Sequence, residues 1–307
     1  MSVLVFSHPA CLDHRPGAGH PESPERLASV VQALKAALPG LEWRQAPAAL
    51  RSQLARAHAD SLIDTILGAD LSAGEFRLDP DTVMGEHSRE AALRCAGAGV
   101  AAVDAVLGGQ ATRAFCAVRP PGHHATTDIA MGFCLFNAVA VAALHALEAH
   151  GLSRVAIADF DVHHGNGTQA IVEHDERILY VSSHQAPLYP GTGGRDERGV
   201  GNVLNQPLAP GADGAALRAA WEQQLLPAMD SFRPQLVLVS AGFDAHRLDP
   251  LADLNAEAAD YAALTEGLLA VARRHAGGRM VSLLEGGYSL TALRECSVAH
   301  VAAMAAG

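Results

Sequence analysis

The sequence predicts an α/β protein whose mainly parallel sheet is covered by helices on both faces. Several short apolar segments lack the polar alternation of a half-exposed strand, which indicates strands that are buried on both sides. These segments alternate with amphipathic or alanine-rich stretches of helical length, an order typical of parallel sheets. Neither a linker-like composition nor a repeat divides the 307 residues, so we expect one domain over residues 1–307.

The predicted strands are the short apolar segments, and polar or glycine-rich sequence follows each of them. The segment at residues 235–240 is apolar throughout, except for its end residues, as expected for a strand in the middle of a sheet. We expect strands at residues 2–7, 113–118, 154–158, 178–183, 235–240 and 279–284.

The first long helix has the clearest start signal, because Ser23 is a favourable N-cap and Pro24 suits the first helical position. Pro39 and Gly40 end this helix, and glycines follow several of the others. We expect a polar loop at residues 72–85 and helices at residues 24–38, 50–68 (as one or two short segments), 88–107, 137–150, 214–230, 256–275 and 291–306.

Composition excludes several classes of protein. A net charge of −11 argues against nucleic-acid or anionic-membrane binding, and no apolar run is long enough for a membrane span. The five cysteines are widely spaced without a CxxC motif, and the first ten residues do not resemble a signal peptide. We therefore expect a reduced, cytoplasmic protein; the sequence is compatible with a homo-oligomer but does not predict one.

Polar clusters follow four of the predicted strands, at the edge where parallel sheets bind ligands. Asp159, Asp161 and His163 alternate along one strand end and therefore share one side of the chain. Asp161 and His163, with Asp244 beyond another apolar strand, form a credible catalytic zinc site with one open position. Burying two carboxylates and an imidazole without a cation would cost too much free energy for simple packing residues.

Three further residue types could complete a hydrolytic site. His123 and His124 follow the strand at 113–118 and titrate near neutrality, so either can act as a general base, and Asp159 can orient one of the rings. Tyr288, on a Gly-Gly turn, can donate a hydrogen bond to an oxyanion. Each motif alone is more often structural, as a helix cap or a turn, but all four clusters follow predicted strands.

Five segments resemble the zinc-dependent histone deacetylase family in their order and spacing. They read RPPGHH at residues 119–124, GFCLFN at 132–137, DFDVHHGNGT at 159–168, AGFD at 241–244 and LEGGY at 284–288, with GHPESPERL at 19–27 as a further match. The resemblance covers nearly the whole chain and is nearest to class II members and to bacterial histone deacetylase-like amidohydrolases.

The resemblance implies the arginase/deacetylase fold, with about eight mainly parallel strands, and zinc bound by Asp161, His163 and Asp244. It implies that a zinc-activated water attacks the acyl amide, with His124 as general base, His123 assisting and Tyr288 polarising the carbonyl. Asp159 would support His123. Asn166 stands where class I enzymes carry an aspartate, and an amide cannot raise the basicity of His124 as a carboxylate would.

The resemblance also implies a channel for an acylated lysine. Its matching positions are Gly132, Phe133, Tyr189 and Leu251, with Tyr189 where a phenylalanine is usual. Polyamine-selective relatives carry a glutamate at the position of Leu251, which disfavours that selectivity here. The resemblance further implies a potassium site that uses Asp159, Asp161, His163, Ser182 and Ser183, mostly through backbone oxygens.

The expected substrate is an acylated lysine peptide or a small acyl-amine. Acetylpolyamine, other acyl-amide or ester hydrolysis on the same site is the alternative, and a non-catalytic acyl-lysine binding module is a less favoured one. A binuclear manganese site of the arginase type is rejected, because Gly165 stands where a second bridging aspartate is needed.

Other histidines are expected to be unremarkable. His145 and His150 are five positions apart on a predicted helix, which places them on different faces, and we expect both to be solvated. His8, His14 and His20 lie in a loop that could shape the channel mouth, and plain loop roles are favoured for His8 and His14.

Overall fold

The computed structural model, which describes residues 3–72 and 74–307, has an eight-stranded sheet at its centre. All neighbouring strands of this sheet pair in parallel. Their spatial order is β2 (Glu42–Gln45), β1 (Val3–Ser7), β5 (Arg113–Cys116), β10 (Met280–Leu284), β9 (Leu236–Ala241), β6 (Val155–Asp159), β7 (Ile178–Gln185) and β8 (Val203–Leu208). The predicted fold class is therefore confirmed.

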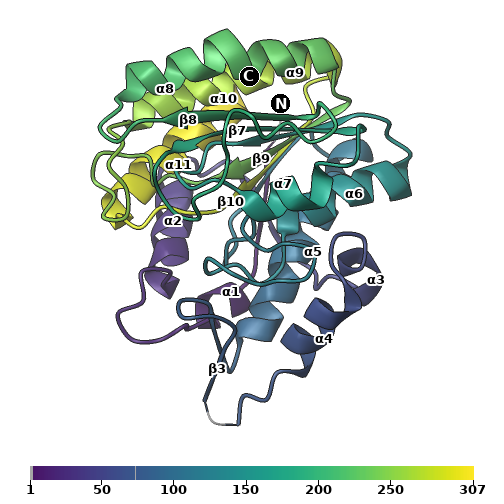
Figure 1. The fold of residues 1–307 in the computed structure, drawn as a ribbon, viewed down its shortest axis with the longest axis vertical. Helices are drawn as coiled ribbons and strands as arrows, with labels where there is room; N and C mark the ends of the chain where they lie inside the picture. Colours follow the sequence, from purple (N-terminus) through teal and green to yellow (C-terminus); the bar gives the residue numbers. More distant parts are fainter. Residues whose placement is uncertain (1–2, 73) are drawn as a thin grey trace.

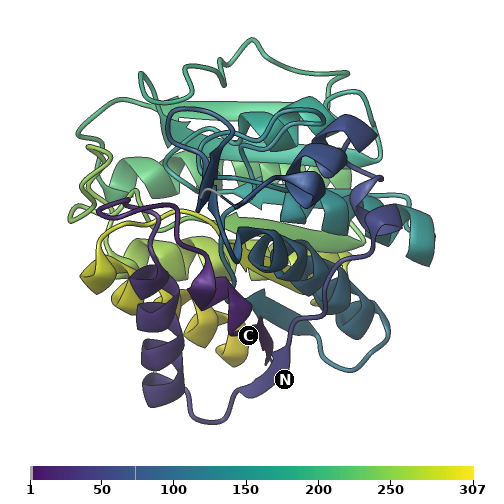
Figure 2. The same cartoon turned by 90° about the horizontal axis from the view of Figure 1, so that it is seen from below.

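Helices cover both faces of the sheet, which explains why its central strands are apolar throughout. Figure 1 shows α8–α10 on one side of the sheet and α5–α7 on the other, and in Figure 2 the blue α5 lies in front of the strands. The helices are α1 (Ala10–Asp13), α2 (Pro24–Ala37), α3 (Arg51–Leu54), α4 (Asp60–Gly68), α5 (Ser88–Leu107), α6 (Ala138–His150), α7 (Asn166–Val172), α8 (Gly214–Ala220), the π-helix η1 (Trp221–Leu225), α9 (Leu226–Phe232), α10 (Ala258–His275) and α11 (Leu290–Ala306).

All six predicted strands and all predicted helices are present, and α5 has the predicted bounds. The predicted helix at residues 214–230 is α8, η1 and α9 in succession, and residues 50–68 form the two short helices α3 and α4. The predicted loop at residues 72–85 contains a small antiparallel pair, β3 (Glu75–Arg77) and β4 (Val83–Gly85); residue 73 lies outside the described residues.

The sheet brings the four predicted polar clusters to one edge. The strands β5, β10, β9 and β6 are consecutive neighbours, and His123–His124, Tyr288, Asp244 and Asp161–His163 follow them in that order. Because the strands are parallel, residues that are more than 160 positions apart in sequence meet beyond their carboxyl ends. β10 is the last strand in the sequence and yet occupies the middle of the sheet, between β5 and β9.

A buried charged network ties the start of the chain to this edge. The Glu22 carboxylate accepts from Arg119 at 2.6 Å and from Arg26 at 3.0 Å, and all three side chains are buried. Arg26 also donates to the backbone oxygens of Gly287 at 2.6 Å and Glu285 at 2.5 Å. The loop that carries Tyr288 is thus held by a residue of α2.

Two expectations about histidines were wrong. His14 is buried, with Nε2 3.3 Å from Glu22 Oε2 and Nδ1 2.6 Å from Ser88 Oγ, so it belongs to the charged network rather than to a plain loop. His145 is also buried, and its ring lies 5.4 Å from that of His150. Both rings reach one acceptor on α5, Asp104, which the spacing along α6 alone could not predict.

All five cysteines are buried free thiols, which agrees with the sequence prediction of a chain without a disulfide framework. Among the helices of the described residues, none combines the length and the apolar character that crossing a membrane requires.

Candidate active site

Three side chains converge beyond the ends of β6 and β9. His163 Nδ1 lies 3.1 Å from Asp161 Oδ1 and 3.2 Å from Asp244 Oδ2, and both aspartates are fully buried. About 3.3 Å separates two ligand atoms around a tetrahedral zinc ion with bonds near 2.0 Å. Each carboxylate oxygen is therefore already spaced from the imidazole nitrogen as a shared metal requires, and all three ligand atoms lie within 4.8 Å of one another. The Asp₂His set matches the preferences of zinc.

The electrostatics of the Asp161, His163 and Asp244 cluster favour a positive charge. Burial alone would lower the pKa of His163, but its contacts with Asp161 and Asp244 raise the pKa to about 10. Burial would likewise raise the pKa of Asp161, yet the charges of His123 and His163 hold it well below the usual range. The pocket thus strongly favours a positive charge between the carboxylates, either a proton or a bound metal ion.

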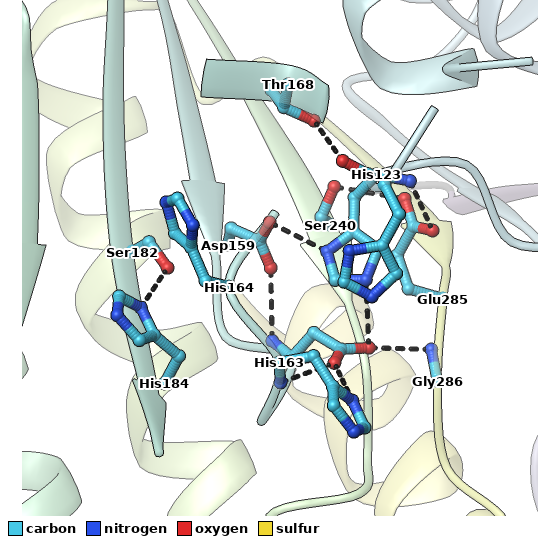
Figure 3. Close-up of polar contacts among 12 residues, drawn as sticks. His123, Asp159, His163, His164, Thr168, Ser182, His184, Ser240, Glu285 and Gly286 are labelled. Atoms are coloured by element: carbon cyan, nitrogen blue, oxygen red, sulfur yellow. Dashed lines mark hydrogen bonds and ion pairs between the residues drawn. The ribbon is translucent and has the colours of Figure 1, made fainter. Parts of the chain in front are cut away.

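Backbone amides fix the two carboxylates from behind. Asp161 accepts from the N–H of His163 at 2.9 Å and of Gly286 at 2.8 Å, and Asp244 Oδ1 accepts from Val162 N–H at 2.9 Å. Figure 3 shows Gly286 and His163 with the dashed contacts that they make in this part of the site. Such outer contacts set the orientation of metal ligands and are as much a part of a metal site as the ligands themselves.

Two glycines let the backbone approach the carboxylates closely. A Cβ at Gly286 would lie 2.1 Å from Asp244 Oδ2 and 2.5 Å from Asp161 Oδ2. A Cβ at Gly242 would lie 2.0 Å from Asp161 Oδ2. No side chain fits at either position without displacing a ligand, which explains the glycines at both strand ends.

His123 is held by a buried carboxylate. Its Nδ1 lies 3.1 Å from Asp159 Oδ2 (Figure 3). The same oxygen accepts from the Tyr180 hydroxyl at 3.1 Å. Burial would lower the pKa of His123, but Asp161 and Asp159 raise it to about 10. Asp159 therefore lies behind His123, apart from the cluster of three ligand atoms, as the sequence analysis expected.

His124 has the opposite electrostatic character. Burial, together with the neighbouring rings of His123 and His163, holds the pKa of His124 well below the usual range. Its Nδ1 lies 2.8 Å from Asn166 Oδ1, so the amide oxygen accepts the Nδ1 proton and leaves Nε2 unprotonated. A neutral imidazole with a free Nε2 is the form that a general base requires.

Tyr288 lies beside His124 and His163 in one cavity of about 230 Å³. The Arg26 guanidinium stacks 4.8 Å above the Tyr288 ring, and Asp249 accepts from the Tyr288 backbone N–H at 2.6 Å. Desolvation of the half-buried phenol raises its pKa, so the hydroxyl keeps its proton and can donate it in a hydrogen bond.

The predicted channel residues line this same cavity. Phe133, Gly132, Tyr189 and Leu251 form its walls with Asp81 and Leu188. The Tyr189 ring contacts His124 edge-on at 5.1 Å, and the Phe133 ring contacts Tyr288 at 5.9 Å. The His20 ring packs edge-on against Phe133, one wall of this cavity, with 4.6 Å between the ring centroids.

The two serines expected near a second cation are buried on β7. Ser182 pairs in register with Asp159 of β6, and its hydroxyl lies 2.9 Å from His184 Nδ1 (Figure 3). The Ser183 hydroxyl accepts from Trp221 Nε1 at 2.9 Å. Both hydroxyls already contact a side chain of the protein.

Three supporting residues escaped the sequence analysis. Glu285 is fully buried and accepts from the backbone N–H of Gly122 at 2.6 Å and of His123 at 3.2 Å, which fixes the histidine loop; burial raises its pKa to about 7. Asp249 accepts from Leu251 N–H at 3.0 Å as well as from Tyr288. Tyr180 supports Asp159. Of the three, only Glu285 had a signal in the sequence, because it lies within the LEGGY segment.

Comparison with known proteins agrees with this arrangement. A family model described as "Histone deacetylase domain" matches residues 20–304. A histone deacetylase-like amidohydrolase of Pseudomonas aeruginosa is 42% identical over 292 residues, covering 92% of this chain and 76% of that protein. A probable deacetylase of Archaeoglobus fulgidus is 36% identical over 313 residues, covering 98% of this chain and 86% of that one.

A solved structure shows the same fold. The crystal structure of the HDA15 HD domain superimposes with a TM-score of 0.93 at 35% sequence identity, covering 99% of this chain and 88% of that chain. Sequence and structural similarity thus extend over nearly the whole molecule, including all four strand ends described above. This chain belongs to the histone deacetylase domain family.

Proposed function

We propose that this protein is a zinc-dependent amidohydrolase that removes acetyl or other acyl groups from lysine-type amines. The single observation that carries the proposal is the shared cavity: His163, of the Asp₂His cluster, opens into the same space as the neutral His124 and the protonated Tyr288. A ligand set, a base and a hydrogen-bond donor that face one cavity are the elements of metal-assisted acyl hydrolysis.

Asp161, His163 and Asp244 would hold the zinc ion. Bound there, zinc would supply Lewis acidity toward the acyl oxygen and the attacking water. Two carboxylates balance the charge of a divalent ion, so the acidity available from the metal is modest and a separate base is needed. The Asp₂His spacing and the backbone donors behind both carboxylates support this assignment.

His124 is the proposed base. Its Nε2 takes the proton of the attacking water, while Asn166 keeps the other ring proton on Nδ1. As the amide breaks, the same Nε2–H is in position to protonate the leaving amine. His123, held charged by Asp159, stabilises negative charge near the reacting carbon without exchanging the proton itself.

Tyr288 is the proposed donor to the acyl oxygen. The Asp249 carboxylate and the Arg26 guanidinium hold its backbone and ring, so the hydroxyl needs little reorganisation during the reaction. Phe133 and Tyr189 form walls that suit the alkyl chain of a lysine, and Leu251 adds an apolar surface. Asp81 at the same cavity favours a substrate that carries positive charge or amide N–H groups.

We also propose a potassium ion held by Asp159, Asp161, His163, Ser182 and Ser183, mostly through backbone oxygens. The parallel register that pairs Asp159 with Ser182 supports this, because it sets their backbones side by side beneath the zinc ligands. The prediction is tested by measuring zinc affinity in potassium and in tetramethylammonium buffers; equal affinity in both would contradict it.

The decisive test is turnover of an acetyl-lysine peptide reporter, with and without a chelator, followed by a panel of acyl-lysine, acylpolyamine and ester substrates. We expect chelator-sensitive release of acetate from the lysine peptide and little preference for the polyamine, because Leu251 supplies no charge. A protein that binds stoichiometric zinc and reporter without any turnover would instead be an acyl-lysine binding module.

A further inference from the structure

A second cluster of metal-ligand side chains lies between α5 and α6. Nε2 of His145 and Nε2 of His150 lie 2.7 Å and 2.6 Å from the same oxygen, Oδ1 of Asp104. The ends of α5 and α6 lead into the starts of β5 and β6, so the cluster lies at the sheet edge opposite the candidate active site. The proposed reaction uses none of these residues.

The convergence is not a consequence of helical spacing. Residues five apart on an ideal helix point about 140° away from each other. His150 is the last residue of α6, and the left-handed Gly151 follows it, so its side chain can turn back beside Asp104. The two imidazoles then lie 5.4 Å apart, nearly perpendicular at 77°, with both Nε2 atoms directed at one point.

We propose that Asp104, His145 and His150 form a second binding site for a divalent ion of the zinc type. Two imidazole nitrogens and one carboxylate oxygen are ligands that zinc, nickel and copper prefer, whereas magnesium prefers oxygen. Asp104 and His150 are 51% and 27% exposed, so the remaining coordination positions face water. This proposal is independent of the proposed amidohydrolase activity.

Little movement separates the present geometry from a metal-bound one. The ligand atoms are 2.6–2.7 Å apart as hydrogen-bonded pairs and need about 3.3 Å around a tetrahedral zinc ion. The difference of roughly 0.6 Å is within reach of two partly exposed side chains on helix ends. The hydrogen bonds therefore hold the ligands in place before the metal binds, which lowers the cost of ordering them.

Arg56 stabilises the metal-free, hydrogen-bonded form of this cluster. Its Nη1 donates to His145 Nδ1 at 3.0 Å, which places the ring proton on Nε2, where it donates to Asp104. For the metal to bind, that proton must leave Nε2 and Nδ1 must become protonated in its place. Arg56 then turns toward Glu148, which already accepts from its Nε at 3.0 Å. Removing the guanidinium should therefore tighten metal binding.

The test is metal stoichiometry and affinity, measured by calorimetry and elemental analysis on full-length protein. Wild type should bind two equivalents of zinc, and His150→Ala only one. His174→Ala is the matched control, because His174 is an 82% exposed histidine outside the cluster, and it should keep both equivalents. Asp244→Ala should lose the equivalent of the candidate active site and keep this one.

Affinity gives a second, independent readout. Loss of His150 should weaken the site by more than the roughly 10- to 100-fold that loss of an outer-shell partner costs, and Arg56→Ala should strengthen it. Nickel should compete with zinc, whereas magnesium should not. The proposal is overturned if Asp244→Ala binds no zinc at all, or if His150→Ala and His174→Ala bind the same number of equivalents.

Discussion

Replacing Gly286 by alanine should empty the zinc site while leaving every ligand residue in place. The added Cβ would lie 2.1 Å from Asp244 Oδ2 and 2.5 Å from Asp161 Oδ2. Real Cβ atoms essentially never approach another heavy atom within 3.0 Å. The Asp244 oxygen would have to move by about 0.9 Å. Metal–ligand distances tolerate only about 0.2 Å, so such a shift removes the oxygen from the metal.

Neither carboxylate has a free direction in which to move. Asp161 accepts from the N–H groups of His163 and of Gly286 itself, and Asp244 from Val162. A Cβ at Gly242 would also lie 2.0 Å from the same oxygen of Asp161, so Gly242 closes the other side. We expect zinc affinity to fall at least about 100-fold and turnover to fall with it, while overpacking costs about 1–3 kcal/mol of stability.

The assay is zinc content after dialysis, together with turnover of an acetyl-lysine reporter and a thermal unfolding curve to confirm folding. Gly68→Ala is the matched control, because its Cβ would meet nothing within 4 Å, and it should keep both zinc and activity. A folded Gly286→Ala protein with the zinc content of wild type and full turnover would refute the steric argument.

Four further outcomes follow from the same contacts. Asp244→Ala should abolish zinc binding at the active site, which a competition assay with a chromogenic chelator would detect. Tyr288→Phe should keep zinc but lower kcat by about 10²–10³, because one oxyanion donor is lost. Asp249→Asn should retain zinc and lower kcat about 10- to 100-fold through misplacement of Tyr288; unchanged kcat would remove this positioning role. Glu22→Gln should lower the free energy of unfolding by about 3–5 kcal/mol at neutral pH, because it leaves Arg119 and Arg26 partly unpaired. Burial would raise the pKa of Glu22, but Arg119 and His14 hold it well below the usual range. The ionised Glu22 therefore contributes fully to the free energy of unfolding above a pH of about 4.3, and this contribution is lost gradually as the pH falls below that value. The difference in free energy of unfolding between the two proteins should therefore be constant from pH 7 to about pH 5 and shrink as the pH falls toward 3, and a gap that stays constant down to pH 3 would contradict this account.

The order of the elements was predictable because strand and helix signals in this chain are local. Apolar runs predicted every strand that a site residue follows or lies on. Ser23–Pro24 and the glycines after helices predicted where helices begin and end. The elements that were missed carry weak local signals. β2 is a short edge strand of mostly polar residues, β8 contains Pro207 at the other edge, and α7 begins with Asn166–Gly167, which resembles a turn.

The candidate site was predictable where residues lie directly after a strand, and not where distant segments meet. Asp161, His163 and Asp244 converge because the sheet order makes β6 and β9 neighbours. The contacts of Asp249 with Tyr288, of Glu285 with the histidine loop, and of Asp104 with His145 join segments whose proximity no local pattern encodes. The same limit led to the wrong predictions that His145 is solvated and that the two rings lie apart, whereas His150 is exposed as expected.

The position of β10 has a consequence for how the protein is made. This strand is the last to be synthesised, and it fills the gap between β5 and β9 at the centre of the sheet. A growing chain on the ribosome therefore has two half-sheets and no Tyr288, and Arg26 lacks the carbonyl oxygens of Glu285 and Gly287. Folding that depends on such late, long-range contacts is slow and leaves apolar edges exposed meanwhile. The candidate active site is consequently complete only after β10 has entered the sheet, and a chain that stops short of β10 lacks Tyr288 and exposes apolar sheet edges.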